Sequence, residues 1–271
     1  MTTQLVYRTA VPEDLPSIAQ HICDSPDDGT IWQRPTTIGD SRWLYCVMLD
    51  WMASCFLDPG KMIRVAVVPV TVEAAAAGAR DEVIGVAIWI QRILKDGNIV
   101  VRQWRPQEDK LVVTAILEEA KQLFHAKHPN PPEPPSITSH VEALARSRKA
   151  MPPSLSTSSP SLHLYGIGVS PSHRRQGVAR TLIRWGQDHN EIMYVTGESG
   201  GLNLYRACGF SIIRDTQIWL DIFGKEISAE AVEKGDEGWK RDKGGCSMAE
   251  AVWVPEGKEV EIRGTVYTAS G

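Results

Sequence analysis

The chain has 271 residues, which is enough to bury a hydrophobic core and excludes disulfide miniproteins and disordered tails. Apolar residues make up 42 % and charged residues 23 %, and 29 Lys and Arg face 33 Asp and Glu, for a formal net charge of -4. This balance argues against a nucleic-acid binder, because affinity for phosphates requires a basic surface.

The sequence lacks the patterns of a membrane protein, a secreted protein and a cysteine-rich protein. No apolar run approaches the roughly 18 residues of a membrane span, and the first residues lack the basic start and apolar stretch of a signal peptide, so we expect a soluble, cytoplasmic protein without a membrane partner. The five cysteines are widely spaced and include no CxxC pair. We therefore expect neither a disulfide framework nor a metal site.

The N-terminal third predicts strands and helices. Residues 5–8 have the composition of a strand, and Pro12 with acidic neighbours is typical of the first turn of a helix. Apolar residues at helical spacing predict another helix over 41–56. Segments 62–72 and 83–91 are rich in Val and Ile and predict two neighbouring strands.

Residues 94–161 have a different pattern. Apolar spacing predicts a helix over 108–127, and Ser139 with Glu142 forms a capping box for a short second helix. A proline-rich run follows each of them. We expect a helical, proline-rich insertion within a single domain of residues 1–271, and the pattern leaves open whether it covers a site as a lid or lies far from one.

From residue 162 onward, strands and helices alternate. The predicted strands are 162–169, 192–196 and 211–220, and the predicted helices are 177–189 and 202–208. Alternation of this kind is typical of an α/β fold with binding chemistry at the carboxyl ends of its strands. Residues 221–271 are expected to form a C-terminal extension with a last strand at 246–254.

The clearest functional signal follows the strand at 162–169. Pro171 stops that strand, and a basic segment containing Gly177 opens an amphipathic helix. Free N–H groups and the positive end of the helix dipole make such a helix start an anion site. Gly177 and the small Ala179 permit a close approach to the main chain. Positive charge comes from Arg174, Arg175 and Arg180, so we expect a phosphorylated ligand here.

The run Arg174-Arg175-Gln176-Gly177-Val178-Ala179 resembles the acetyl-CoA motif of the GCN5-related N-acetyltransferase (GNAT) superfamily, which is Arg or Gln, two residues, Gly, one residue, and Gly or Ala. Val169 and Pro171 before it and residues 204–210 after it are similar to the family in the expected order. The resemblance covers about residues 5–220, apart from the insertion.

This resemblance implies a twisted mixed sheet flanked by helices, with the fourth and fifth strands splayed apart to admit the pantetheine arm of the coenzyme. That arm would lie against Ile167, Gly168 and Val169. The pyrophosphate would lie on the loop and helix start formed by Arg174, Arg175, Gln176, Gly177, Val178, Ala179 and Arg180. The cosubstrate is acetyl-CoA, and no metal is implied.

Transfer of an acetyl group to an amine requires a neutral nucleophile, a stabilised oxyanion and a proton for the departing thiolate. The resemblance assigns the proton donation to Tyr205 and the oxyanion contact to the backbone N–H of Val169. By the resemblance, His163 stands where relatives carry a glutamate or a histidine that acts as the general base. Its reference pKa of about 6.5 suits that role. Glu198, after the next strand, is the reserve base.

Side-chain alternation in a regular strand places His163, Tyr165, Ile167 and Val169 on one face. Tyr165 would then lie beside His163, where it could hold a water molecule that relays the proton. A lone histidine on an apolar strand is also often a core residue, so both interpretations of His163 stay open.

A competing motif overlaps this region. Gly197-Glu198-Ser199-Gly200-Gly201 matches the G-x-S-x-G nucleophile elbow of hydrolases. All seven histidines precede Ser199, however, so the order of residues in that catalytic triad cannot be completed. We therefore prefer the acetyltransferase hypothesis.

The acceptor is less constrained. Trp32, Trp43 and Trp51 lie in the region that forms the acceptor side in relatives, and aromatic walls suit a small amine, although tryptophans at helical spacing more often belong to a core. We predict direct transfer, in a ternary complex, to the primary amine of a small molecule. A protein or peptide acceptor and a non-catalytic acyl-CoA-binding module stay as alternatives, and the oligomeric state is open.

Overall fold

The computed structural model describes residues 4–24, 42–71, 76, 79–104, 106, 108–129, 160–198, 201–218, 246–262 and 264–269. The chain divides into two compact units. The first unit comprises residues 1–25, 45–129 and 159–193, and the second comprises 26–44, 130–158 and 194–271. The helix expected around Ser139 and Glu142 lies outside the described residues.

The first unit is built on antiparallel strands. Their order is β1 (Val6–Thr9), β2 (Lys61–Val68), β3 (Glu82–Lys95) and β5 (Ser161–Val169). Residues 83–89 of β3 are all buried, because helices cover both faces of this central strand. The strands predicted at 5–8, 62–72, 83–91 and 162–169 are thus confirmed.

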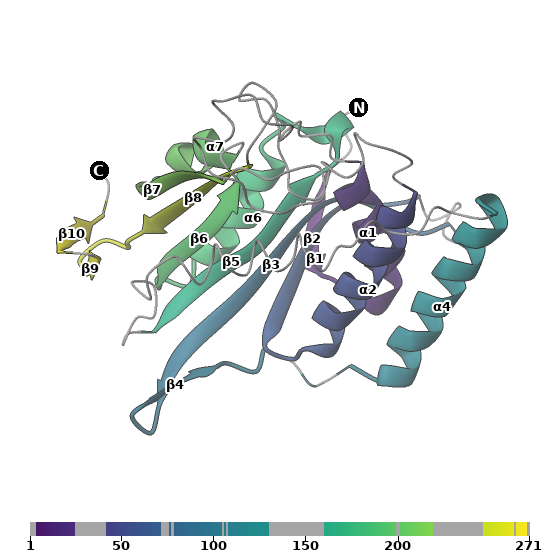
Figure 1. The fold of residues 1–271 in the computed structure, drawn as a ribbon, viewed down its shortest axis with the longest axis horizontal. Helices are drawn as coiled ribbons and strands as arrows, with labels where there is room; N and C mark the ends of the chain where they lie inside the picture. Colours follow the sequence, from purple (N-terminus) through teal and green to yellow (C-terminus); the bar gives the residue numbers. More distant parts are fainter. Residues whose placement is uncertain are drawn as a thin grey trace, which may run out of the picture. The chain divides into compact units, whose positions relative to one another are not determined.

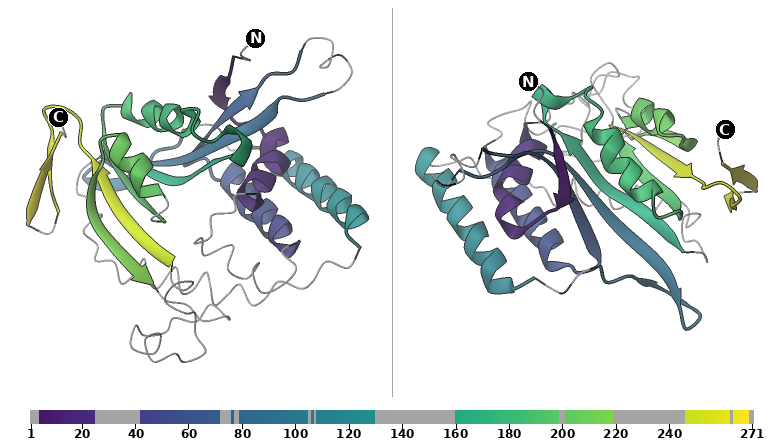
Figure 2. Two further views of the ribbon diagram at one scale, coloured as in Figure 1. Left: turned by 90° about the horizontal axis from the view of Figure 1, so that it is seen from above. Right: turned by 180° about the vertical axis from the view of Figure 1, so that it is seen from behind.

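Helices cover the two faces of this sheet unequally. α1 (Leu15–Cys23), α2 (Trp43–Leu57) and α4 (Lys110–Lys127) lie on one face, and α6 (Val178–Gln187) lies on the other (Figures 1 and 2). We call these the α2 face and the α6 face. The helices predicted over 41–56, 108–127 and 177–189 are confirmed.

α4 packs against α2. The rings of Tyr45 and Phe124 are 5.1 Å apart between centroids, and the Lys121 Nζ atom lies 2.7 Å from the Asp50 carboxylate. The main helix of the expected insertion is therefore part of the helical layer on the α2 face.

Close contacts between glycine and large side chains fix α6 on the sheet. A Cβ atom at Gly85 of β3 would lie 2.8 Å from Val178 Cγ1, and a Cβ atom at Gly186 of α6 would lie 2.6 Å from the ring of Trp89. Only glycine permits helix and strand to approach this closely at both points. These contacts position the start of α6, where the sequence predicts an anion site.

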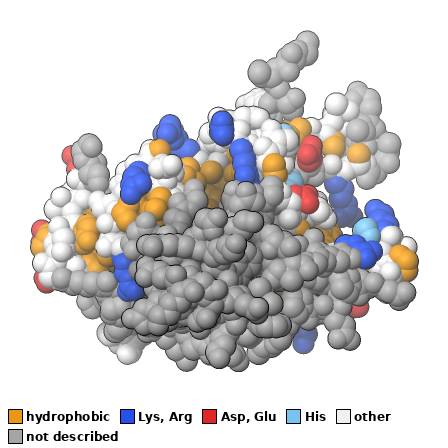
Figure 3. Space-filling view, turned by 45° about the horizontal axis from the view of Figure 1, so that its top comes forward, with side chains coloured by type: hydrophobic (Ala, Val, Ile, Leu, Met, Phe, Trp, Pro, Cys, Tyr) orange, Lys and Arg blue, Asp and Glu red, His pale blue; other side chains and the backbone are white. Residues whose placement is uncertain are grey.

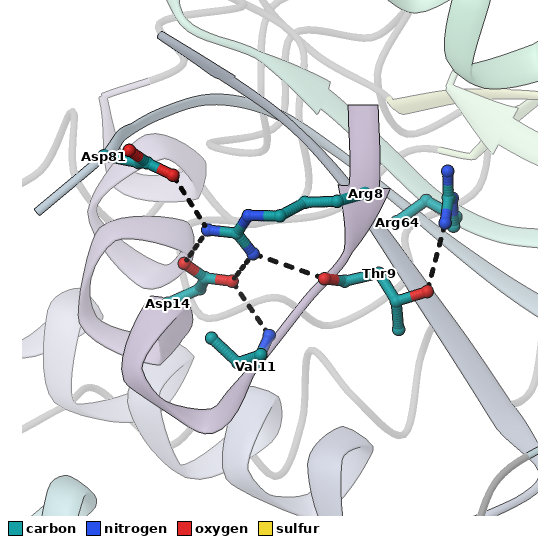
Figure 4. Close-up of polar contacts among 6 residues, drawn as sticks. All are labelled: Arg8, Thr9, Val11, Asp14, Arg64 and Asp81. Atoms are coloured by element: carbon teal, nitrogen blue, oxygen red, sulfur yellow. Dashed lines mark hydrogen bonds and ion pairs between the residues drawn. The ribbon is translucent and has the colours of Figure 1, made fainter. Parts of the chain in front are cut away.

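An ion pair joins β1 to the first helical turn (Figure 4). The Arg8 guanidinium donates to both carboxylate oxygens of Asp14, at 2.6 and 2.9 Å, and Asp14 also accepts from the backbone N–H of Val11 at 2.9 Å. The Asp14 carboxylate raises the pKa of Arg8 mainly through this hydrogen bond. The turn η1 (Pro12–Asp14) that precedes α1 is therefore tied to the sheet.

Residues 94–101 differ from the prediction. β3 continues to Lys95 and pairs with β4 (Asn98–Val101) through a turn with positive φ at Asp96 (51°) and Gly97 (76°). Asp-Gly is the usual signal for this hairpin turn, and Asp96-Gly97 is present in the sequence. Residues 94–101 therefore belong to the sheet and not to a helical insertion.

The second unit contains a smaller set of strands. β6 (Ile192–Glu198), β8 (Cys246–Trp253) and β7 (Ser211–Ile218) are neighbours in that order, and α7 (Leu202–Ala207) packs on β7. The last strand predicted at 246–254 is confirmed. Two strands were not predicted, β9 (Glu259–Ile262) and β10 (Thr265–Thr268), which form a separate antiparallel hairpin.

The α/β fold class is confirmed, with a sheet flanked by helices. The splay between the strands at 162–169 and 192–196 stays a prediction. None of the described helices is both long and apolar enough to cross a membrane. On the face drawn in Figure 3, the described Lys and Arg side chains lie in several separate groups.

Candidate functional site

The loop after β5 is tied to the end of that strand. The N–H of Ser170 donates to the Ile84 carbonyl of β3 at 2.8 Å, and the turn η4 (Pro171–His173) follows. The Arg174 side chain then reaches back, with its Nε–H donating to the Val169 carbonyl at 3.4 Å. The basic segment identified in the sequence is thereby anchored at the carboxyl end of β5.

Two residues with positive φ shape the turn into α6. Arg175 has φ 62° and Gly177, the N-cap of α6, has φ 82°. In loops whose backbone N–H groups converge on an anion, residues with positive φ alternate with residues of negative φ. A Cβ atom at Gly177 would have no neighbour within 4 Å, so the space in front of this main chain is open.

The first turn of α6 supplies the N–H groups. Its hydrogen-bond ladder begins with Thr181, whose N–H donates to the Gly177 carbonyl at 3.0 Å. The preceding amides of Val178, Ala179 and Arg180 have no helical carbonyl to bind. The side chains of Arg175 and Arg180 are exposed beside them. These residues fit a pyrophosphate, because an open surface, unsatisfied donors and positive charge coincide.

The register of β5 corrects the prediction that four side chains share one face. Gly166 pairs with Ile88 and Leu164 pairs with Trp89, so Tyr165 is an extra, bulged residue. A bulge reverses the alternation of side chains on its two sides. The prediction assumed an unbroken strand and is wrong in this respect.

The two faces can be assigned from the paired residues. His163 pairs with Ile90, and Gly166 and Gly168 pair with Ile88 and Val86, which places all of them on the α2 face. Ile167 and Val169 pair with Ala87 and Gly85 and lie on the α6 face. On the α2 face, the segment of β5 after the bulge therefore carries glycines alone.

The surroundings of His163 disfavour the protonated, positively charged form of its imidazole. Its Nε2 atom is buried, and Arg92 lies on the same face, two residues from the partner of His163. Burial, and secondarily the charge of Arg92, lowers the pKa of His163 from 6.5 to about 3. The imidazole is neutral at physiological pH and is a weak acceptor for the proton of an ammonium group.

Tyr165 lies in contact with Trp51 and Lys61, and the sequence analysis, which considered Tyr165 and Trp51 separately, did not predict these contacts. Its ring stacks on Trp51 of α2, with centroids 6.0 Å apart, and the Lys61 Nζ atom lies 4.9 Å from its centroid. Lys61 Nζ is also 3.7 Å from the Asp58 carboxylate. Trp51 and Lys61 are far from Tyr165 in sequence, so only the pairing of the strands and the packing of α2 could reveal this group.

Tyr205 of α7 is buried in the second unit and is enclosed by glycines. A Cβ atom at Gly197 would lie 2.8 Å from the Tyr205 hydroxyl, and a Cβ atom at Gly201 would lie 2.8 Å from its ring. The two outer glycines of the G-x-S-x-G sequence thus make room for the tyrosine. This packing explains their presence without a nucleophile elbow.

The structure gathers part of the predicted site. Within the first unit, β5 and the turn into α6 bring together the residues predicted to contact the coenzyme, namely Ile167, Gly168, Val169, Arg174, Arg175, Gln176, Gly177, Val178, Ala179 and Arg180. Tyr205 belongs to the second unit. Trp32 and Ser199, and the side chains of Trp43 and Glu198, lie outside the described part of the chain.

Comparison with protein families identifies the segment around this turn. Residues 141–210 match the model of the acetyltransferase (GNAT) family. The match includes β5, the turn, α6 and Tyr205, which are the residues on which the sequence resemblance was based. The resemblance is confirmed over that segment. No curated protein matches the chain.

Solved structures that match the chain include several acetyltransferases. NAA60 from Arabidopsis thaliana, in complex with acetyl-CoA, is 13 % identical, with 92 % of this chain and 98 % of that chain covered and a TM-score of 0.43. The Escherichia coli ribosomal-protein-S18-alanine N-acetyltransferase is 9 % identical, with 93 % and 94 % covered and a TM-score of 0.41. A mosquito arylalkylamine N-acetyltransferase-like protein is 14 % identical, with 92 % of this chain and 99 % of that chain covered and a TM-score of 0.38.

Proposed function

We propose that this chain, whose residues 141–210 form a GNAT acetyltransferase segment, is an acetyl-CoA-dependent N-acetyltransferase that acts on the primary amine of a small molecule. The observation that carries the proposal is the open main-chain turn at Gly177, with positive φ at Arg175 and Gly177 and three unsatisfied amides behind it. A pyrophosphate satisfies those donors and the neighbouring arginines together.

Acetyl-CoA supplies the acetyl group as a thioester. We assign to the N–H of Val169 the contact with the oxygen that becomes negative during transfer. Gly166 and Gly168 leave the α2 face of β5 without side chains of its own next to that amide, and we assign the pantetheine arm and the acceptor to this side. We assign to the Tyr205 hydroxyl the proton that the departing sulfur needs.

The base is assigned differently from the sequence hypothesis. A residue with a pKa of about 3 does not set the pH profile of an enzyme near neutrality. In our proposal His163 stays neutral and accepts a hydrogen bond on the acceptor side, where Tyr165 and Trp51 form an aromatic wall. The acceptor then enters as the free amine, or Glu198 removes its proton.

Substitution at the turn tests the coenzyme site. Gly177→Glu places bulk and negative charge where the pyrophosphate would bind, so we expect no measurable affinity for acetyl-CoA by calorimetry. Gly97→Glu is the matched control, because Gly97 has φ 76° and also lacks any neighbour within 4 Å. Equal affinities of Gly177→Glu and the wild type would refute the site.

A screen of amines with acetyl-CoA, followed by mass spectrometry, tests the reaction and its acceptor. We expect acetylation of at least one small primary amine, while peptides with free N-termini or lysines serve as the comparison. Preferred acetylation of peptides would replace the small-molecule acceptor with a protein. Tight binding of acetyl-CoA without any transfer would favour a non-catalytic binding module.

A further inference from the structure

A cluster of aromatic rings occupies the end of α6 opposite to Gly177. Trp185 lies at its centre, with ring centroids 5.9 Å from Trp89, 5.8 Å from Trp104 and 4.4 Å from His189. We call Trp89, Trp104, Trp185 and His189 the tryptophan cluster. Trp185 follows Gly177 by eight residues along α6, which corresponds to a rise of about 12 Å.

Two guanidinium groups lie on these rings. The Cζ atom of Arg64 is 5.4 Å from the centroid of Trp185, and the Cζ atom of Arg102 is 4.9 Å from the centroid of Trp104. Both side chains lie on the α6 face, since Arg64 pairs with Ala87 and Arg102 bonds the side chain of Gln91. Two of the three indole rings therefore each have a guanidinium group against them.

Neither arginine is neutralised within the part of the chain that the structure describes. Arg64 donates to the Thr9 hydroxyl at 3.0 Å and to the Tyr7 carbonyl at 3.3 Å, and Arg102 donates to the amide oxygen of Gln91 at 3.1 Å (Figure 4 shows the contact with Thr9). All three acceptors are uncharged. Burial lowers the pKa of Arg64, which reflects the cost of keeping this charge away from water.

The cluster also contains unsatisfied hydrogen-bond donors. The indole Nε1 atoms of Trp89 and Trp104 are buried and have no acceptor among the described residues. An indole N–H can only donate, and a buried donor without an acceptor is costly. His189 is oriented by a hydrogen bond of 2.8 Å between its Nδ1 and the Trp185 carbonyl, which makes Nδ1 the protonated nitrogen.

We propose that the tryptophan cluster with Arg64 and Arg102 binds a small oxyanion, either a carboxylate or a phosphate group, at a site separate from the turn at Gly177. Guanidinium and indole groups are donors only, and an oxyanion offers acceptors and negative charge together. Bound water would satisfy the indoles, but only an anion would also compensate the half-buried charge of Arg64. The proposal does not depend on the acetyltransferase function.

The test is a fluorescence titration with citrate and with inorganic phosphate, at constant ionic strength maintained with sodium chloride. Because three tryptophans form the site, we expect a saturable change in intrinsic fluorescence with at least one of the two anions. The anion with the higher affinity identifies the group as carboxylate or phosphate. The same change in Gly177→Glu would show that the turn into α6 is not its source.

Variants complete the test. We expect Arg64→Met and Arg102→Met each to weaken binding at least tenfold, while Arg184→Met, an exposed arginine beside Trp185 on α6, leaves it unchanged. Arg102 is exposed, so its substitution remains informative if Arg64→Met fails to fold. Absence of a saturable change with both anions, or binding that survives Arg102→Met, would overturn the proposal.

Discussion

At the scale of single residues, close packing against two glycines determines the position of Tyr205. Gly197 and Gly201 leave space only for its ring, which also contacts Phe210 with centroids 5.9 Å apart. A ring held in this way keeps its hydroxyl in one place, as a proton donor requires.

Tyr205→Phe removes the proposed proton donor and keeps the ring. We expect turnover to fall about 100-fold, in the range typical of general acids, with the affinity for coenzyme A nearly unchanged. Steady-state kinetics with acetyl-CoA, together with calorimetry, measure both quantities. Tyr7→Phe on β1 is the control, and undiminished turnover of Tyr205→Phe would remove this residue from the mechanism.

His163 predicts an effect of pH on stability. Its pKa lies near 6.5 when the chain is unfolded and is lowered to about 3 in the fold, so the unfolded state binds the proton more readily between these values. The stability conferred by neutral His163 is complete above about pH 6.5 and is lost as the pH falls towards 3. The slope is at most about 1.4 kcal/mol per pH unit.

Urea unfolding at a series of pH values measures this slope. His163→Gln cannot titrate, so its stability should decline less steeply with acid than that of the wild type. His125→Gln on the exposed side of α4 is the control and should retain the wild-type slope. Identical slopes for His163→Gln and the wild type would contradict the buried, neutral imidazole.

At the scale of elements, the position of α6 on the sheet controls the turn at its start. The helix contacts β3 where a Cβ atom at Gly85 would lie 2.8 Å from Val178 Cγ1. Val178 follows Gly177 directly, so displacement of this contact also displaces the amides proposed to hold the pyrophosphate.

Gly85→Ala tests that contact. The added methyl group requires a shift of α6, and we expect a loss of about 1–3 kcal/mol in the free energy of unfolding and weaker binding of acetyl-CoA. Gly166→Ala on β5 is the matched control for stability, because its added atom would lie 3.7 Å from the nearest neighbours. Equal losses in the two variants would show that the contact of α6 with β3 is not critical.

At the scale of the whole molecule, we expect the binding of acetyl-CoA to increase the free energy of unfolding. A ligand at 100 times its dissociation constant, bound only by the folded chain, adds about 2.7 kcal/mol to the free energy of unfolding. We expect this increase in urea unfolding with acetyl-CoA for the wild type and for Gly97→Glu, and none for Gly177→Glu. An equal increase in all three would place the coenzyme elsewhere.

Much of the fold and part of the site followed from the sequence. The helices α2, α4 and α6 and most strands of both units were predicted from the spacing or the composition of their apolar residues. The turn from Arg174 to Arg180 was also predictable, since a glycine with positive φ, the helix start and the arginines all lie within a few consecutive residues. The conformation and the charge of such a turn depend on consecutive residues, so the sequence alone is sufficient to predict them.

Other features arise only from contacts between distant segments. The bulge at Tyr165 depends on how β5 pairs with β3, and it moves His163 to the face opposite Ile167 and Val169. The lowered pKa of His163 depends on burial and on Arg92 of the neighbouring strand. Periodicity assumes an unbroken strand in an average environment, so the chemistry that depends on sheet register and burial was decided by the tertiary structure alone.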